Sequence, residues 1–130
     1  EVVIPRLKND LVELLTAAAG QQLDKVIIET DPRTACTVVA VSGGYPGDYE
    51  KGKVISGLDK VKGSIPFLAG AVSKGDQIVT NGGRVLALTS FGKDFIAALK
   101  HSNRNAKTVQ FEGKNYRRDI GNDLINQSNI

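Results

Sequence analysis

The spacing of apolar residues near the start of the chain predicts an amphipathic helix. Apolar side chains recur every three or four residues after Pro5, and Gly20 stands where a helix commonly ends. Further along, Asp31-Pro32 is a turn signal, and the apolar, β-branched run from Thr34 to Ser42 predicts a strand buried on both faces. The apolar positions of the expected helix are Leu7, Leu11, Leu14, Leu15 and Ala18.

Short apolar runs separated by glycines and charges then predict a meander of strands. The first candidates are residues 53–55 and 65–72. Two more runs, 77–80 and 84–88, flank Asn81-Gly82-Gly83, and Asn-Gly between apolar runs is a strong signal for a β-hairpin. We therefore expect these two runs to pair with each other.

A second helix is predicted from near Asp94 to near Lys107, because apolar and small residues recur at helical intervals. Its middle holds the weak helix formers Ser102, Asn103 and Asn105.

The end of the chain is expected to form a last strand at 108–112 and a polar tail at 115–130 that frays at its end. Strands and helices that do not strictly alternate predict an α+β fold. We expect a compact, largely antiparallel β-sheet, or a small barrel-like domain, with two helices.

Composition fits one globular domain, with 130 residues, 41% hydrophobic and 24% charged. The net charge of +3 comes from basic residues interleaved with acidic ones, and aromatics are only 5%, so we expect no nucleic-acid partner. No apolar segment is long enough to span a bilayer, and the single cysteine has no partner for an intramolecular disulfide. We expect a cytoplasmic protein with no membrane partner. Because the chain starts at Glu1 and contains no methionine, we also expect it to be a piece of a longer protein.

Five motifs in order carry a family resemblance. They are PRLKNDL at 5–11, GGYPGDY at 43–49, TNGGRVL at 80–86, FEG at 111–113 and YRRDIG at 116–121. Together they resemble the C-terminal end of the phosphoribosylamine–glycine ligases, also called glycinamide ribonucleotide synthetases. The resemblance covers nearly the whole chain and departs from the family locally, at Ser102-Asn103, where such enzymes usually have an alanine and a tyrosine.

The resemblance implies an ATP-grasp ligase of de novo purine biosynthesis that forms a carbon–nitrogen bond. ATP phosphorylates the glycine carboxylate, and the amine of phosphoribosylamine attacks the acyl phosphate. It further implies that residues 1–20 form the helical end of the ATP-grasp region and 21–130 the C-terminal domain. ATP and Mg²⁺ would be bound mainly by upstream lobes of the same ligase chain, which would be the main partner of this segment.

The residues themselves agree with a segment that does not catalyse the reaction alone. No Gly-rich loop with lysine and serine occurs, and no two carboxylates have a spacing that obviously makes a metal site. We therefore assign no catalytic residue and no metal ligand, and we expect the isolated chain to be inactive.

Arg6 and Lys8 are the first candidates for substrate binding. Cations near a helix N-terminus oppose its dipole, whereas an anion held there is stabilised, so an unfavourable placement suggests that the pair faces a phosphate or acyl-phosphate group. The alternative is a solvated polar face opposite the leucines.

Gly43, Gly44, Tyr45 and Pro46 are the second group of candidates. Successive glycines can free backbone N–H groups to form an anion-binding concavity, with Tyr45 as a wall. The alternative is a tight turn between strands. The last candidate, Arg84, would bind a ribose phosphate through its guanidinium; alternatively it only begins the return strand of the hairpin.

Two other classes of protein remain open. A small antiparallel β binding or carrier module would need an exposed lysine at a hairpin tip, where we expect Asn81-Gly82-Gly83 instead. A structural domain without a ligand would use every glycine loop as a turn, and would not expose a large apolar patch.

Overall fold

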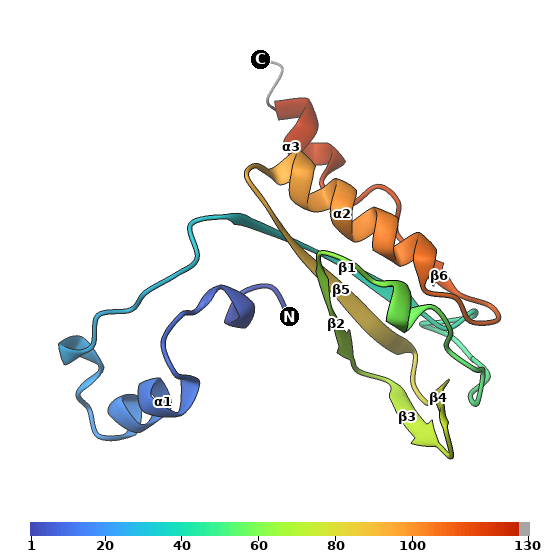
Figure 1. Cartoon of the computed structure of the whole chain (residues 1–130), viewed down its shortest axis with the longest axis horizontal. Helices are drawn as coiled ribbons and strands as arrows, with labels where there is room; N and C mark the ends of the chain where they lie inside the picture. Colours follow the sequence, from blue (N-terminus) through green and yellow to red (C-terminus); the bar gives the residue numbers. More distant parts are fainter. Residues whose placement is uncertain (128–130) are drawn as a thin grey trace.

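A four-stranded antiparallel sheet in the order β2-β5-β1-β6 forms the centre of the structure, and helix α2 lies across one of its faces (Figure 1). The computed structural model describes residues 1–127, and the side chains of residues 1–124. The predicted α+β, largely antiparallel fold is confirmed, and the sheet is open rather than closed into a barrel. The elements of this unit are β1 (Thr34–Val41), β2 (Ser64–Leu68), β5 (Arg84–Gly92), β6 (Asn115–Tyr116) and α2 (Phe95–Thr108).

Strand β1 is buried on one face only, so the expectation of a doubly buried strand is wrong. Cys36, Val38 and Ala40 point into the core beneath α2, whereas the residues between them are half-buried. One of these half-buried residues, Thr37, lies opposite Thr89 of β5 in the strand register. The sheet therefore keeps one face free of α2, and this face carries the candidate site.

The expected hairpin at Asn81-Gly82-Gly83 does not form. Strand β4 (Gln77–Thr80) pairs with β3 (Ala71–Lys74) around Gly75, in a separate two-stranded sheet, while β5 pairs with β1 and β2. A type I′ turn needs positive φ at both central residues, and none of residues 81–83 has it. Instead, the Asn81 N–H donates to the Gly70 carbonyl at 2.8 Å, and the chain passes from the small sheet to the large one.

Four other expectations about strands and helices are corrected. The run 65–72 divides into β2 and β3, while 53–55 and 108–112 form only the isolated bridges Val54–Val79 and Ser56–Gln110. A third helix, α3 (Asn122–Gln127), follows the two expected ones. The fraying expected at the end of the tail falls on residues 128–130, which lie outside the described part of the chain.

Helix α2 is fixed to the sheet by a buried serine. The helix begins where the Asp94 carboxylate accepts a hydrogen bond from the Ala97 N–H at 2.8 Å. The hydroxyl of Ser102, which is fully buried, lies 2.8 Å from both the Cys36 carbonyl and the Ser90 hydroxyl. A residue that weakens the helix locally therefore stabilises its contact with the sheet.

Asn105 makes a second polar contact between α2 and the sheet. Its side-chain amide donates to the Lys62 carbonyl at 2.8 Å and accepts from the Lys62 N–H at 3.2 Å. It also donates to the Ser64 hydroxyl at 2.6 Å. These bonds satisfy a buried polar side chain and join α2 to the start of β2.

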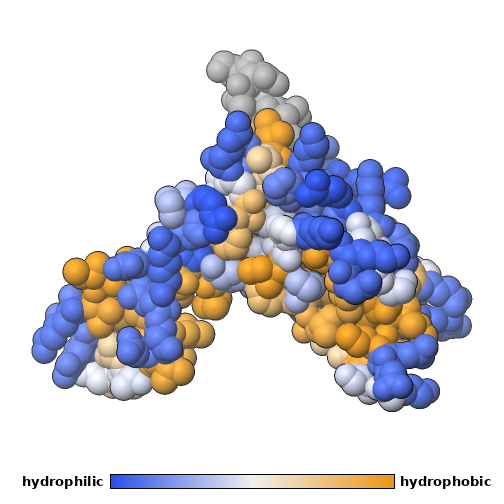
Figure 2. Space-filling view, in the orientation of Figure 1, coloured by the Kyte–Doolittle hydropathy of each residue, from blue (hydrophilic) through white to orange (hydrophobic). Residues whose placement is uncertain are grey.

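The N-terminal arm, residues 4–31, extends away from the sheet and carries α1 (Leu11–Ala19) (Figure 1). Helix α1 begins only at Leu11, because the Asp10 carboxylate accepts hydrogen bonds from the N–H groups of Val12 and Glu13. The Lys8 N–H donates to the Glu29 carbonyl, which ties the two ends of the arm together. Figure 2 shows apolar side chains on the surface of this arm, and they include Val12, Leu15 and Ile27. No helix within residues 1–127 has the length and apolar character needed to cross a membrane.

Candidate functional site

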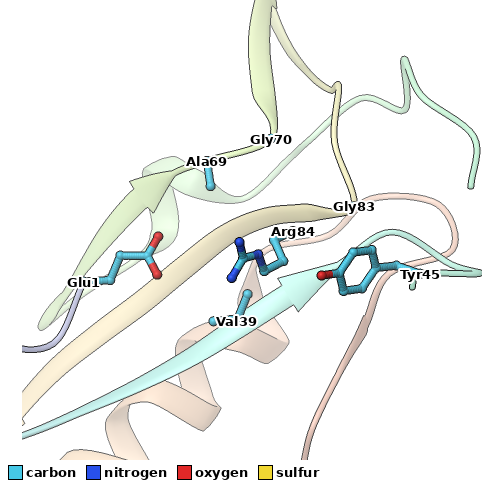
Figure 3. Close-up of a pocket in the computed structure, with 7 residues that line it drawn as sticks. All are labelled: Glu1, Val39, Tyr45, Ala69, Gly70, Gly83 and Arg84. Carbon is cyan, nitrogen blue, oxygen red and sulfur yellow. The ribbon is translucent and has the colours of Figure 1, made fainter. Parts of the chain in front are cut away.

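Two adjoining cavities lie on the sheet face that α2 leaves free. The Glu1 cavity has a volume of about 580 Å³ and the Tyr116 cavity about 460 Å³, which is the size range of small-molecule sites. Val39, Tyr45 and Arg84 line both. The Glu1 cavity is completed by Glu1, Ala69, Gly70 and Gly83 (Figure 3), and the Tyr116 cavity by Thr37, Val41, Pro46, Asn115, Tyr116, Arg117 and Ile120.

Tyr45 lines both cavities and is held against Gly83. A Cβ atom on Gly83 would lie 2.1 Å from Cδ2 of the Tyr45 ring, so the ring occupies the space that any side chain there would need. Ser42, just before the loop, donates from its N–H to the Gly83 carbonyl at 2.8 Å and from its hydroxyl to the Gly82 carbonyl at 2.9 Å. Tyr49 meets the Tyr45 ring edge-on, with 6.2 Å between the ring centroids. Contacts with other residues of the chain therefore fix the position of the Tyr45 ring.

Gly43 and Gly44 serve the packing of their loop. A Cβ on Gly43 would come within 2.8 Å of the Gly113 carbonyl oxygen. Gly44 has φ +95°, and a Cβ there would meet the Asp48 carbonyl oxygen at 2.0 Å. Neither glycine lines the Glu1 cavity or the Tyr116 cavity, and both lie close to the backbone of this chain. Contact of the two glycines with a ligand stays a prediction.

Arg84 follows an irregularity at the end of the β1–β5 ladder. The register shifts between Ala40 and Val41, which places Arg84 opposite Val41 and leaves Val85 as the extra residue. The Arg84 side chain is exposed and has no hydrogen-bond or ion-pair partner among the described residues. Figure 3 shows it lying in the Glu1 cavity between Glu1 and Tyr45. Tyr45, Pro46 and Arg84, which we predicted as site residues, therefore come together.

The sequence interpretation missed Asn115, Tyr116 and Arg117, which line the Tyr116 cavity. The pairing of β6 with β1 sets Tyr116 opposite Ala40 and Asn115 opposite Val41. The motif at 116–121 was the available signal, but its proximity to Tyr45 depends on this pairing between distant segments.

The lining of the Tyr116 cavity includes two cations, Arg84 and Arg117, and two more basic side chains lie near Tyr116. The Tyr116 ring has Lys114 Nζ 5.5 Å and the Arg118 guanidinium 5.8 Å from its centroid. Burial, and then the charge of Arg118, lower the pKa of Lys114. Arg117 bonds Asp119 at 2.7 Å, which lowers the pKa of that carboxyl. Anions are the ligands that such a surface favours.

Arg6 and Lys8 lie elsewhere, on the N-terminal arm, and line neither cavity. They also do not stand at the start of α1, because that helix begins at Leu11, so the dipole argument for them is wrong. Arg6 donates from Nη2 to the Asp31 carbonyl at 3.1 Å, and its Nε is buried without a partner; Lys8 is exposed. Their contact with a substrate stays a prediction.

Comparison with known proteins places this geometry in a family. Residues 35–123 match the family model described as phosphoribosylglycinamide synthetase, C domain, and these residues include the sheet, α2 and most of both cavities. The chain belongs to the phosphoribosylglycinamide synthetase C-domain family. The relationship predicted from the five motifs is therefore confirmed.

Relatives of this C-domain family are longer than the chain. It is 46% identical over 121 residues to phosphoribosylamine–glycine ligase of Vibrio cholerae, an alignment that covers 92% of the chain and 28% of that relative. It is 42% identical to the trifunctional purine biosynthetic protein adenosine-3 of Gallus gallus, over 93% of the chain and 12% of the relative. The chain thus spans little more than a quarter of the length of the bacterial ligases it matches.

A solved structure shows the same fold. The crystal structure of phosphoribosylamine–glycine ligase from Thermotoga maritima superposes with a TM-score of 0.66 at 36% identity, over 82% of this chain and 27% of that one. The C-domain family therefore accounts for the open α+β sheet and for the antiparallel pairing described above.

Proposed function

We propose that the chain is the C-terminal part of an ATP-grasp phosphoribosylamine–glycine ligase and completes the substrate cleft of that enzyme. The reaction joins glycine to phosphoribosylamine, in the cytoplasm, in de novo purine biosynthesis. Two findings support the proposal: membership of the C-domain family, and the meeting of Tyr45 with the free cation Arg84 on the open face of the sheet. The assignment of the site rests on the meeting of Tyr45 with Arg84.

Arg84 is proposed to bind the phosphate of phosphoribosylamine. A guanidinium matches phosphate oxygens with two parallel N–H donors, and Arg84 has no protein partner to give up first. Tyr45 and Pro46 form the wall beside it, and Gly43 and Gly44 give the loop the shape that holds this wall in place.

We propose that Arg6 and Lys8, which lie on the N-terminal arm, face the phosphate or acyl-phosphate groups bound by the upstream lobes. ATP and Mg²⁺ would be held mainly by those lobes; within residues 1–127 no group of three or more His, Cys, Asp or Glu could hold a metal ion. From the resemblance we expected residues 1–20 to be the helical end of the ATP-grasp region and 21–130 to be the C-terminal domain. The hydrogen bonds that join residues 6–9 to 27–31 favour a boundary after Asp31.

The carrier-module alternative is set aside on family grounds. From the sequence we argued against a carrier module because the expected hairpin tip, residues 81–83, contains no lysine. That argument fails, because the hairpin that does form, β3–β4, has the exposed Lys74 at its tip. Membership of the ligase C-domain family outweighs this single residue.

The test is ADP formation that depends on both glycine and phosphoribosylamine. It is measured with this chain alone, with the separately produced upstream lobes, and with the two mixed. We expect activity that requires the mixture. Mixed pieces that are folded and associated, yet inactive, would contradict the proposal.

A further inference from the structure

The Glu1 cavity contains two opposite charges that do not pair with each other. Figure 3 shows the Glu1 carboxylate and the Arg84 guanidinium directed into the cavity from different sides. Across the part of the chain whose side chains are described, neither of these charged groups has a hydrogen-bond or ion-pair partner. Both residues are exposed, so their charges are accessible to a ligand without the loss of a protein contact. Their separation leaves room for a ligand between them.

The backbone of Glu1 is anchored to the two central strands of the sheet. The Glu1 carbonyl accepts a hydrogen bond from the Thr89 hydroxyl at 2.7 Å, and the Thr37 hydroxyl lies 2.7 Å from that of Thr89. Thr37 and Thr89 are partners in register on β1 and β5, the two central strands. Glu1 therefore reaches the cavity from a fixed point on the same strands that carry Val39 and Arg84.

We infer that Glu1 binds the amine end of an amino-sugar phosphate whose phosphate lies on Arg84. The inference rests on the proposed function and gives the ligand a direction in the cleft. A carboxylate accepts hydrogen bonds from an amine, and a guanidinium donates to a phosphate. Phosphoribosylamine carries both groups at opposite ends of one sugar. Glu1 is then the residue that recognises the reacting amine, and Arg84 and Tyr45 hold the rest of the molecule.

The experiment uses the intact ligase that contains this chain, with Glu1→Ala and the exposed Glu29→Ala as matched control. Two constants are measured: the KM for phosphoribosylamine, and the inhibition constant of 1,4-anhydroribitol 5-phosphate, the same phosphosugar with no group at C1. Glu1→Ala is expected to raise the KM roughly tenfold or more, the order of magnitude for a hydrogen bond to a charged group. The inhibition constant should change less than twofold, and Glu29→Ala should change neither.

The outcomes distinguish a failure of the Glu1 assignment from a failure of the proposed ligase function. An unchanged KM in Glu1→Ala, or an equal loss of affinity for the anhydro analogue, would overturn the assignment of Glu1 while leaving the ligase function intact. A wild-type ligase whose ADP formation does not depend on phosphoribosylamine would overturn the proposed function, and this inference with it.

Discussion

Replacing Gly83 with alanine tests the contact that positions Tyr45. Gly83 does not have positive φ, so its backbone tolerates alanine, and the effect of the substitution comes from the added methyl group. That methyl would lie 2.1 Å from Cδ2, 2.6 Å from Cε2 and 3.0 Å from Cγ of the Tyr45 ring. Because carbon atoms pack at about 3.5–4.0 Å, the ring must retreat by roughly 1.4 Å or leave its place. Overpacking of a buried core costs about 1–3 kcal/mol, and because Tyr45 is 40% exposed and can move toward the cavities, we expect a cost of about 1 kcal/mol here.

A double-mutant cycle with Tyr45→Ala isolates this clash. We expect Gly83→Ala to lower the free energy of unfolding by about 1 kcal/mol in the wild-type chain, and to have almost no effect once the ring is removed. Urea denaturation of the four variants gives the coupling energy directly. Equal destabilisation in both backgrounds, or no destabilisation in either, would refute the placement of Tyr45 on Gly83.

Three further predictions concern other parts of the fold. Ser102→Ala should lower the free energy of unfolding by about 1–3 kcal/mol in urea denaturation, because a buried carbonyl, that of Cys36, loses a donor, whereas the exposed Ser73→Ala should have little effect. The Cys36 thiol, whose pKa is raised by burial, should not react with a thiol reagent at pH 8 until the chain unfolds; rapid reaction of the folded chain would contradict its burial. Hydrogen bonds from Arg33 lower the pKa of Asp31 from its usual 3.8, so the stability it adds is complete above that pH and is lost as the pH falls through the lowered value. The difference in unfolding free energy between wild type and Asp31→Asn should therefore shrink below about pH 4, and a difference independent of pH would contradict this pairing.

Local patterns predicted those elements that depend on neighbouring residues. The limits of β1 and α2 agree closely with the expected strand and helix, because a run of β-branched residues and the helical spacing of apolar residues are local signals. The Asn-Gly signal failed because pairing is decided elsewhere: β5 joins β1 over its whole length, and Gly82 instead packs on the Gly70 backbone. A choice between partners distant in the sequence is not encoded in the turn.

The site was predicted in part for the same reason. Tyr45 and Arg84 were chosen from unusual local residues, and the structure brings them together. Tyr116 reaches the same place only through the β1–β6 pairing. Glu1 does so through the hydroxyl of Thr89, more than eighty residues away. No spacing in the sequence indicates either contact.

The KM of the intact ligase for phosphoribosylamine after Arg84→Ala is the most direct test of the account. Loss of a charge-assisted contact to phosphate is worth about 1.5–3 kcal/mol, so we expect the KM to rise roughly 10- to 100-fold, with the KM values for glycine and ATP unchanged. Arg104→Ala, at an exposed position of α2, serves as the matched control and should leave all three values as they are. An unchanged KM for phosphoribosylamine in Arg84→Ala would contradict the claim that this face of the sheet binds the substrate.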